Sequence, residues 1–372
     1  MSWRDCTLGD VIKLQRGHDL PERVRVDGPV PIVSSSGVTG RHNVAKADPP
    51  GVVTGRYGTI GEVFYVGEPY WPLNTALYVV DFKDNDPRFT AYLLRNSLRN
   101  YKSEKAAVPG VDRKVLHLLK VRTTERRRQE RVVEILSGYD DLIENNRRRI
   151  ALLEEAARML YREWFVHFRF PGHEHVKIID GLPEGWERRA LADVVDVVKD
   201  AVKPADFVED DIHIGLEHIP RRSFTLAEWE PTDGLASGKT RFAEGDILFC
   251  KIRPYFHKVG FALRAGLASS DAIVWRVKDS EDWPLVVCAT SSDHFVAVAS
   301  KTAREGSKMP RADEKVLLGY SVPKPPKGLL SIFNNSILPT TQQCKTLALQ
   351  SRSLAQGRDL LLSRLMNGGI AV

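Results

Sequence analysis

The sequence contains only four cysteines, and they lie far apart, at Cys6, Cys250, Cys288 and Cys344. Because no Cys-x-x-Cys pair is present, the cysteines predict neither a zinc site nor a disulfide framework. The chain also lacks an apolar run near the ~18 residues that a membrane span requires, and its first residues do not resemble a signal peptide. These absences argue against a membrane protein and against a disulfide-rich secreted protein. We therefore expect a cytoplasmic location.

Signatures of catalysis are equally scarce. Ala236–Thr240 resembles part of a phosphate-binding loop, but Asp233 stands where that motif requires a glycine. Asp48–Pro50 resembles the start of the Asp-Pro-Pro-aromatic loop of adenine methyltransferases, but Gly51 replaces the aromatic residue. His173–His175 could bind a metal, yet the surrounding linker offers no obvious third ligand. Turns and solvated surface explain these stretches better, so we predict no catalytic residue, metal or cofactor in this chain.

What the chain does contain is a repeat. Asp112–Leu116 reads Asp-Arg-Lys-Val-Leu, and Asp313–Leu317 reads Asp-Glu-Lys-Val-Leu. Each block precedes a valine and then a long helical run, so one globular segment and one helix are used twice. A length of 372 residues fits two domains of roughly 100–200 residues each. A net charge of +6 is compatible with a polyanionic partner, and also with an ordinary basic protein.

The residue pattern divides the chain into five segments. Residues 1–124 and 185–326 read as short strands punctuated by turns, with a linker at 171–184. Residues 125–170 and 327–372 carry apolar residues alternately four and three apart, which predicts coiled-coil helices. The seam positions are Leu136, Tyr139, Ile143, Asn146, Ile150, Leu153 and Leu160 in the first run and Leu347, Leu354, Leu361 and Leu365 in the second. We expect an α+β fold in which two similar domains of mixed, barrel-like sheet and short helices are joined by two long antiparallel helices about a pseudo-two-fold axis.

Two loops carry the side chains that suit DNA. The loop Thr54–Gly61 places an arginine and a tyrosine between glycines on a hairpin, and Cys250–Gly260 is its positional counterpart. Arginine can pair with guanine edges or hold phosphates, and tyrosine can stack or form hydrogen bonds. Solvated turns remain the alternative. The predicted DNA contacts are Arg41, His42, Arg56, Tyr57 and Lys105 in the first half, and Lys251, Arg253, Tyr255, His257, Lys258, Lys308 and Arg311 in the second.

The layout of two domains, each followed by a long helix, resembles the specificity subunit of type I restriction-modification systems. The resemblance covers nearly the whole chain, and the helical stretches Ile150–Phe165 and Arg358–Gly368 are its most specific part. Gln129 and Gln342 fall where this family tends to place a glutamine at each helix start, and Gly55–Gly61 looks like its glycine-bearing loop.

The resemblance implies a non-catalytic reader of double-stranded DNA. Its two target-recognition domains would each bind one half of a split, asymmetric target, and the helices would set the spacing. Two methyltransferase subunits that use S-adenosylmethionine would join it, as could endonuclease or translocase subunits for restriction. The alternatives are a stand-alone DNA methyltransferase or nuclease, and a protein–protein scaffold without a role on DNA.

Overall fold

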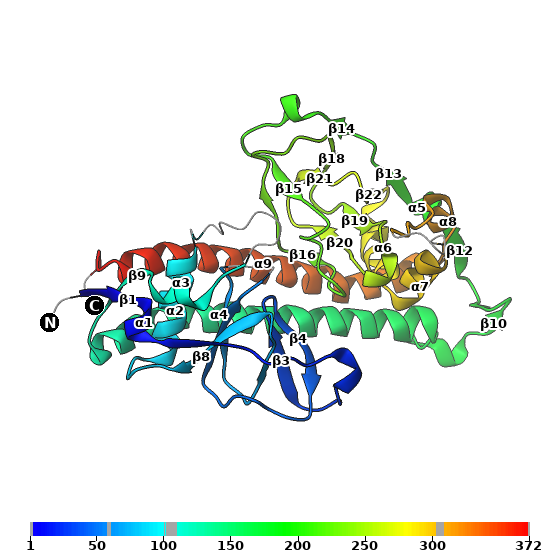
Figure 1. Cartoon of the computed structure of the whole chain (residues 1–372). Coiled ribbons are helices and arrows are strands. Elements are labelled where there is room, and N and C mark those ends of the chain that lie inside the picture. Colours follow the sequence, from blue (N-terminus) through cyan, green and yellow to red (C-terminus); the bar gives the residue numbers. More distant parts are fainter. Residues whose placement is uncertain (1–2, 58–60, 100, 102–109, 303–308, 371–372) are drawn as a thin grey trace. The chain divides into compact units, whose positions relative to one another are not determined.

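The computed structural model describes residues 3–57, 61–99, 101, 110–302 and 309–370 (Figure 1). The chain forms two compact units: the first consists of Met1–Leu142 and Leu354–Val372, and the second of Ile143–Ser353. Two long helices each contribute a segment to both units. They are α4 (Arg126–Tyr161), which continues into a π-helical turn at Arg162–Val166, and α9 (Lys327–Met366). Within the described residues, no helix is both long and apolar enough to cross a membrane.

The first unit is built on a four-stranded and a three-stranded sheet. The larger sheet has the order β2-β8-β5-β6, with β2 (Lys13–Arg16), β8 (Ala76–Asp81), β5 (Gly51–Gly55) and β6 (Val63–Val66) all antiparallel. The smaller has the order β4-β3-β7, with β4 (Gly37–His42), β3 (Val30–Ser34) and β7 (Trp71–Pro72). The helices beside them are α1 (Leu8–Val11), the 3₁₀ turn η1 (Glu22–Val24), α2 (Pro87–Leu98) and α3 (Arg113–His117). β5 is buried along its whole length, so it is the central strand from which the loop at Arg56 emerges.

The second unit is built on two five-stranded sheets. The first has the order β13 (Val195–Val197), β22 (Ala272–Val277), β19 (Ile247–Cys250), β20 (Val259–Ala262) and β16 (Thr225–Leu226). The other has the order β14 (Ala201–Val202), β18 (Lys239–Phe242), β21 (Gly266–Ala268), β15 (Ile212–Ile214) and β17 (Glu230–Pro231). A small hairpin joins β10 (Ile178–Ile179) to β11 (Leu182–Pro183). The helices are α5 (Leu191–Val194), α6 (Trp283–Thr290), α7 (Asp293–Lys301) and α8 (Glu314–Leu318), with 3₁₀ turns η3 (His173–His175), η4 (Pro204–Asp206), η5 (Pro254–Phe256) and η6 (Ser280–Asp282).

The repeated block forms the same local structure in both units. Asp112 begins α3 by accepting a hydrogen bond from the Lys114 amide at 2.8 Å, and Asp313 begins α8 by accepting one from the Lys315 amide at 2.9 Å. An aspartate at this position satisfies an amide that the first helical turn leaves unpaired. The first copy of the block leads into β9 (Lys120–Thr123), which pairs with β1 (Arg4–Thr7). The second copy leads into β23 (Ser321–Lys324), which pairs with β12 (Glu187–Ala190). The repeat is therefore a duplicated structural frame.

The long helices pair antiparallel within each unit. In the first unit, the start of α4 lies beside the end of α9 (Figure 1), and Arg358 Nη1 donates to Asp140 Oδ1 at 2.6 Å. In the second unit, the Phe165 ring near the end of α4 lies 4.8 Å from the Phe333 ring near the start of α9, centroid to centroid. The expected α+β class and antiparallel pairing are thus confirmed.

The predicted seam residues differ in how deeply they are buried in these helix pairs. Five of the predicted positions are buried, namely Leu136, Ile143, Asn146, Leu347 and Leu365. The other six are half-buried, namely Tyr139, Ile150, Leu153, Leu160, Leu354 and Leu361.

Gln129 and Gln342, both expected at a helix start, lie at different places in their helices. Gln129 lies in the first turn of α4, where its Nε2 donates to Asn85 Oδ1 at 2.7 Å and to the Thr124 carbonyl at 2.8 Å. Gln342 lies in the middle of α9 and is exposed, so the expectation that it marks a helix start is wrong. The helix begins earlier, at Lys327, directly after Pro325 and Pro326. Pro339 lies inside the helix and does not end it.

Candidate nucleic-acid interface

Arg56 is held by its backbone at the end of the central strand β5. Its amide donates to the Thr75 carbonyl at 2.9 Å, and its carbonyl accepts from the Val111 amide at 2.9 Å. The residue is thereby fixed between the turn before β8 and the segment before α3. We call this pair of hydrogen bonds the backbone clamp. Its effect is to present the side chains of Arg56 and Tyr57 at the end of the sheet.

The Arg56 and Tyr57 side chains form a preassembled pair. The guanidinium carbon lies 4.5 Å from the centroid of the Tyr57 ring, and Nη2 lies 3.2 Å from the phenol oxygen, to which it donates. Tyr57 is 38% exposed, so the pair reaches solvent. A guanidinium held over an aromatic ring keeps N–H groups free to donate to a phosphate or to a base edge, at a smaller entropic cost than a freely rotating arginine.

A recess of about 300 Å³ opens around this pair. Besides Arg56 and Tyr57, its walls are Arg16, Leu77, Val111, Asp112 and Arg113. Three guanidinium groups therefore converge on one small volume, and Asp112 is the carboxylate among the residues that line it. Sequence reasoning selected Arg56 and Tyr57 but missed Arg16 and Arg113, which come from β2 and α3. Arg113 lies inside the repeated block Asp112–Leu116, next to Val111, and this position was the signal that could have pointed to it.

The second unit has the same backbone clamp around Lys251. The Lys251 amide donates to the Asp271 carbonyl at 3.1 Å, and its carbonyl accepts from the Ala312 amide at 2.8 Å. Ile252 pairs with Arg311 across a single antiparallel bridge, as Tyr57 does with Gly110. The structural counterpart of Arg56 is therefore Lys251, whereas the order of residues in the two loops had suggested Arg253.

The rest of the second loop divides into exposed and buried side chains. Arg253 and Tyr255 are exposed, and Arg253 adopts a left-handed backbone with φ of 48°. His257 is buried, and a ring nitrogen lies 2.8 Å from the Ser291 carbonyl. Burial lowers the pKa of His257, and burial likewise lowers the pKa of Lys258, whose ammonium group donates to the Leu216 carbonyl. In this structure His257 is buried and Lys258 is half-buried, and both contact backbone carbonyls of the second unit.

The remaining predicted contacts are similarly mixed. Arg41 is exposed at the end of β4 and donates to the Pro29 carbonyl, whereas His42 is buried with its ring 5.3 Å from that of Trp71. Arg311 is half-exposed and lies 3.1 Å from the carboxylate of Asp271. Two further predicted residues, Lys105 and Lys308, lie outside the described residues.

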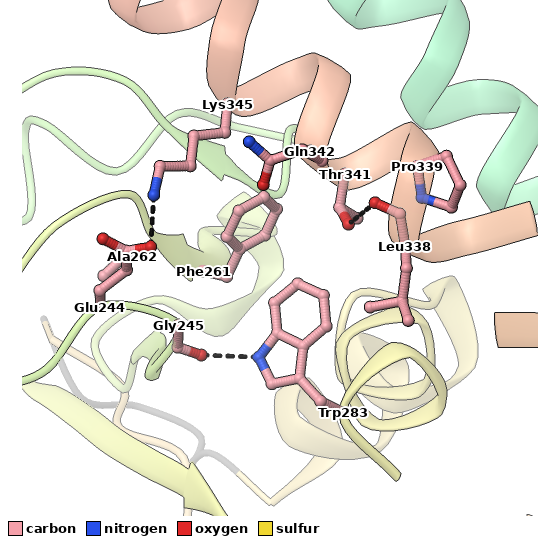
Figure 2. Close-up of a pocket in the computed structure, with 10 residues that line it drawn as sticks. All are labelled: Glu244, Gly245, Phe261, Ala262, Trp283, Leu338, Pro339, Thr341, Gln342 and Lys345. Atoms are coloured by element: carbon pink, nitrogen blue, oxygen red, sulfur yellow. Dashed lines mark hydrogen bonds and ion pairs between the residues drawn. The ribbon is translucent and has the colours of Figure 1, made fainter. Parts of the chain in front are cut away.

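A larger recess, of about 400 Å³, belongs to the second unit alone. Figure 2 shows Phe261 and Trp283 beside the residues of α9 from Leu338 to Lys345. The indole nitrogen of Trp283 donates to the Gly245 carbonyl at 2.7 Å, and Lys345, the cation in its wall, is paired with Glu244. A largely apolar wall whose cation is neutralised is a poor site for a phosphate, so we do not count this recess as part of the DNA interface.

One cluster of potential metal ligands was not anticipated. His213, His218 and Glu230 bring one ligand atom each to within 4.8 Å of one another. His218 Nδ1 accepts from the Gly215 amide at 3.0 Å, so in a neutral ring the proton sits on Nε2, the atom that faces Glu230 and would have to bind a metal. The hydrogen bond from His213 lowers the pKa of Glu230. The cluster is better explained as a hydrogen-bonded link between β15 and β17.

Comparison with known proteins agrees with this geometry. Residues 2–155 match the family model of the type I restriction modification DNA specificity domain. Over 353 residues the chain is 21% identical to the EcoDI specificity subunit of Escherichia coli, covering 88% of this chain and 78% of that protein. Over 73 residues it is 36% identical to the MjaIX specificity subunit of Methanocaldococcus jannaschii, covering 18% of this chain and 17% of that protein.

The fold also has a solved counterpart. The crystal structure of the S subunit of a type I restriction-modification system from M. genitalium superposes with a TM-score of 0.58 at 15% identity, covering 98% of this chain and 96% of that one. Two α+β units with paired antiparallel helices are therefore the architecture of a type I S subunit. The chain is thus similar to type I restriction-modification DNA specificity subunits, in sequence most clearly over residues 2–155 and in fold over nearly its whole length.

Proposed function

We propose that this protein is the non-catalytic DNA reader of a type I restriction-modification complex and that it recognises a split, asymmetric duplex target. One observation carries the proposal. The same backbone clamp occurs in both units, but it presents Arg56 with Tyr57 in the first and Lys251, near Arg253 and Tyr255, in the second. A shared frame with different side chains is what two unequal half-sites require, because sequence is read by the side chains that reach base edges and the frame only positions them.

In this proposal the catalytic work belongs to partners. Two adenine methyltransferase subunits, which bind S-adenosylmethionine, would be positioned on the target by this chain, and endonuclease or translocase subunits would join for restriction. The relatives are specificity subunits of restriction enzymes, which supports such an assembly. The paired helices α4 and α9 would fix the distance between the half-sites.

Sequencing of methylated DNA from the source cell tests the proposal. We expect a split adenine motif with a fixed spacer, and we expect it to disappear when this chain is deleted and to return when it is restored. Purified chain that methylates or cuts DNA without partners would instead establish a stand-alone enzyme. A methylation pattern unchanged by deletion would rule out the reader role and leave the scaffold.

A further inference from the structure

The two backbone clamps make it possible to compare the units position by position. The clamp relates three pairs of residues: Arg56 with Lys251, Thr75 with Asp271, and Val111 with Ala312. Only the second of these pairs differs in charge, since a threonine in the first unit stands where the second unit has an aspartate. That difference decides what the neighbouring cations can bind.

In the second unit the aspartate takes up the cations. The carboxylate of Asp271 lies 3.1 Å from the Arg311 guanidinium and 3.8 Å from the Lys251 ammonium. Lys251 also donates to the Ser270 carbonyl at 2.7 Å. Since Asp271 is only 29% exposed, the ion pairs are partly shielded from water and hold both cations in place. A phosphate approaching here would have to compete with a carboxylate that is already bound.

Among the described residues of the first unit, no carboxylate competes in this way for Arg56. The hydroxyl oxygen of Thr75 is buried and has no hydrogen-bond partner among the described residues, and it carries no charge to offer Arg56. Besides Tyr57, the Arg56 guanidinium donates to the Asn74 carbonyl at 3.5 Å, which is a weak hydrogen bond. The guanidinium is therefore oriented by Tyr57 and not neutralised by a carboxylate in the described part of the chain.

The other two cations of the recess are also available. Arg16 lies 3.7 Å from Asp19, but both side chains are largely exposed, at 51% and 70%, and such a pair contributes little. Arg113 is exposed and makes no ion pair with a described residue. Asp112, the carboxylate among the described residues of the wall, is engaged by the Lys114 amide at 2.8 Å. The recess thus keeps an excess of positive charge directed at a small volume.

We propose that this recess binds a backbone phosphate of the target DNA through Arg16, Arg56 and Arg113, and that Asp271 removes the equivalent subsite from the second unit. Guanidinium groups suit this role because their paired N–H donors match two phosphate oxygens. The inference rests on the proposed DNA-binding function and deepens it. Within that function it assigns Arg56 to positioning the duplex and leaves base reading at this end of the first unit to its neighbour Tyr57. It also makes the two readers unequal in how they hold the backbone.

The test measures duplex affinity against salt concentration for the full chain assembled with its methyltransferase partners. Arg113→Gln should weaken binding to target and unrelated duplexes by the same factor, and it should reduce the slope of log K against log salt by up to about 0.9, the value for one phosphate. Thr75→Asp should do the same by installing the second unit's carboxylate. Asp271→Thr should steepen the slope. Arg131→Gln, which removes an exposed charge from α4 in the same unit, is the matched control and should leave the slope unchanged.

The outcomes separate this inference from the function on which it rests. Salt-dependent, target-specific binding by the parent complex, with affinity and slope unaffected by Arg113→Gln, would overturn the phosphate subsite and leave the reader role standing. No specific binding by the parent complex would remove the reader role itself. If Arg113→Gln abolished binding of inorganic phosphate but left duplex binding unchanged, the recess would bind a free anion and the proposal would fail. Because Arg113 is exposed, its substitution tests the idea even if Thr75→Asp prevents folding.

Discussion

Glu154 is the most heavily hydrogen-bonded carboxylate between a long helix and a sheet, and its replacement is the sharpest test of how α4 holds the second unit. Its Oε1 accepts from the Phe224 amide at 3.1 Å, the Thr225 amide at 3.0 Å and the Thr225 hydroxyl at 2.7 Å. Its Oε2 lies 3.1 Å from the Arg158 guanidinium. The side chain is only 3% exposed, so water cannot replace these partners.

The magnitude follows from what the substitution leaves behind. Glu154→Ala strands two buried amides, the hydroxyls of Ser223 and Thr225 and a partly buried guanidinium. Breaking a buried charge pair on one side costs about 3–5 kcal/mol. We therefore expect Glu154→Ala to lower the free energy of unfolding of the second unit by about 3–5 kcal/mol. Glu154→Gln keeps an acceptor for the amides but loses the charge facing Arg158, so about half of that loss is expected.

Urea denaturation followed by tryptophan fluorescence measures this effect, because Trp229 and Trp275 lie in the second unit and report its unfolding. Glu155→Ala is the matched control. Glu155 is the next residue on the same helix and pairs with the same Arg158 at 3.3 Å, but it is 54% exposed, so its loss should cost less than about 1 kcal/mol. If the two alanine variants were equally stable, the reasoning that ties α4 to β16 through a buried carboxylate would be refuted.

Two further predictions concern one polar network in each unit. Asp140→Ala should destabilise the first unit by about 1.5–3 kcal/mol in chemical denaturation, because it strands the Tyr92 hydroxyl and the Arg358 guanidinium, each bonded to it at 2.6 Å. Tyr92→Phe leaves the ion pair between Asp140 and Arg358 intact and should cost about 1 kcal/mol. Equal losses of stability in the two variants would contradict this account of the network. Burial lowers the pKa of His257 below its ordinary 6.5, so the unfolded chain binds its proton more readily than the folded one. The stability of the second unit should therefore be full above about pH 6.5 and decline as the pH falls towards the folded-state pKa, and His257→Gln should remove that part of the pH dependence in thermal melts.

The duplicated frame was predictable because its signals are local. An aspartate that caps a short helix and a leucine that faces the core act within a few residues, so Asp112–Leu116 and Asp313–Leu317 could be matched by inspection. The long helices were predictable for a similar reason, since a heptad pattern needs only the spacing of apolar residues. The helical run expected from residue 327 agrees with the start of α9 at Lys327, and only Gln342 was misplaced, because it lies in the middle of that helix.

The interface was less predictable, because its geometry depends on contacts between residues distant in sequence. The alignment of Lys251 with Arg56 is set by the carbonyl of Arg56 and the amide of Val111, which the order of residues within one loop does not show. The burial of His42 and His257 likewise depends on the packing of Trp71 and on the Ser291 carbonyl, and a polar residue type gives no indication of either.

The same comparison explains how a duplicated protein could read the asymmetric target that we propose. If the frame were held by the side chains that read DNA, each change of specificity would also change the fold. Here the clamp uses backbone groups of Arg56 and Lys251, so their side chains and the residue opposite, Thr75 or Asp271, are free to differ. Exchanging that opposite residue between the units should therefore change how DNA is held without unfolding either unit. A loss of folding in both exchanges would show instead that the side chains belong to the frame.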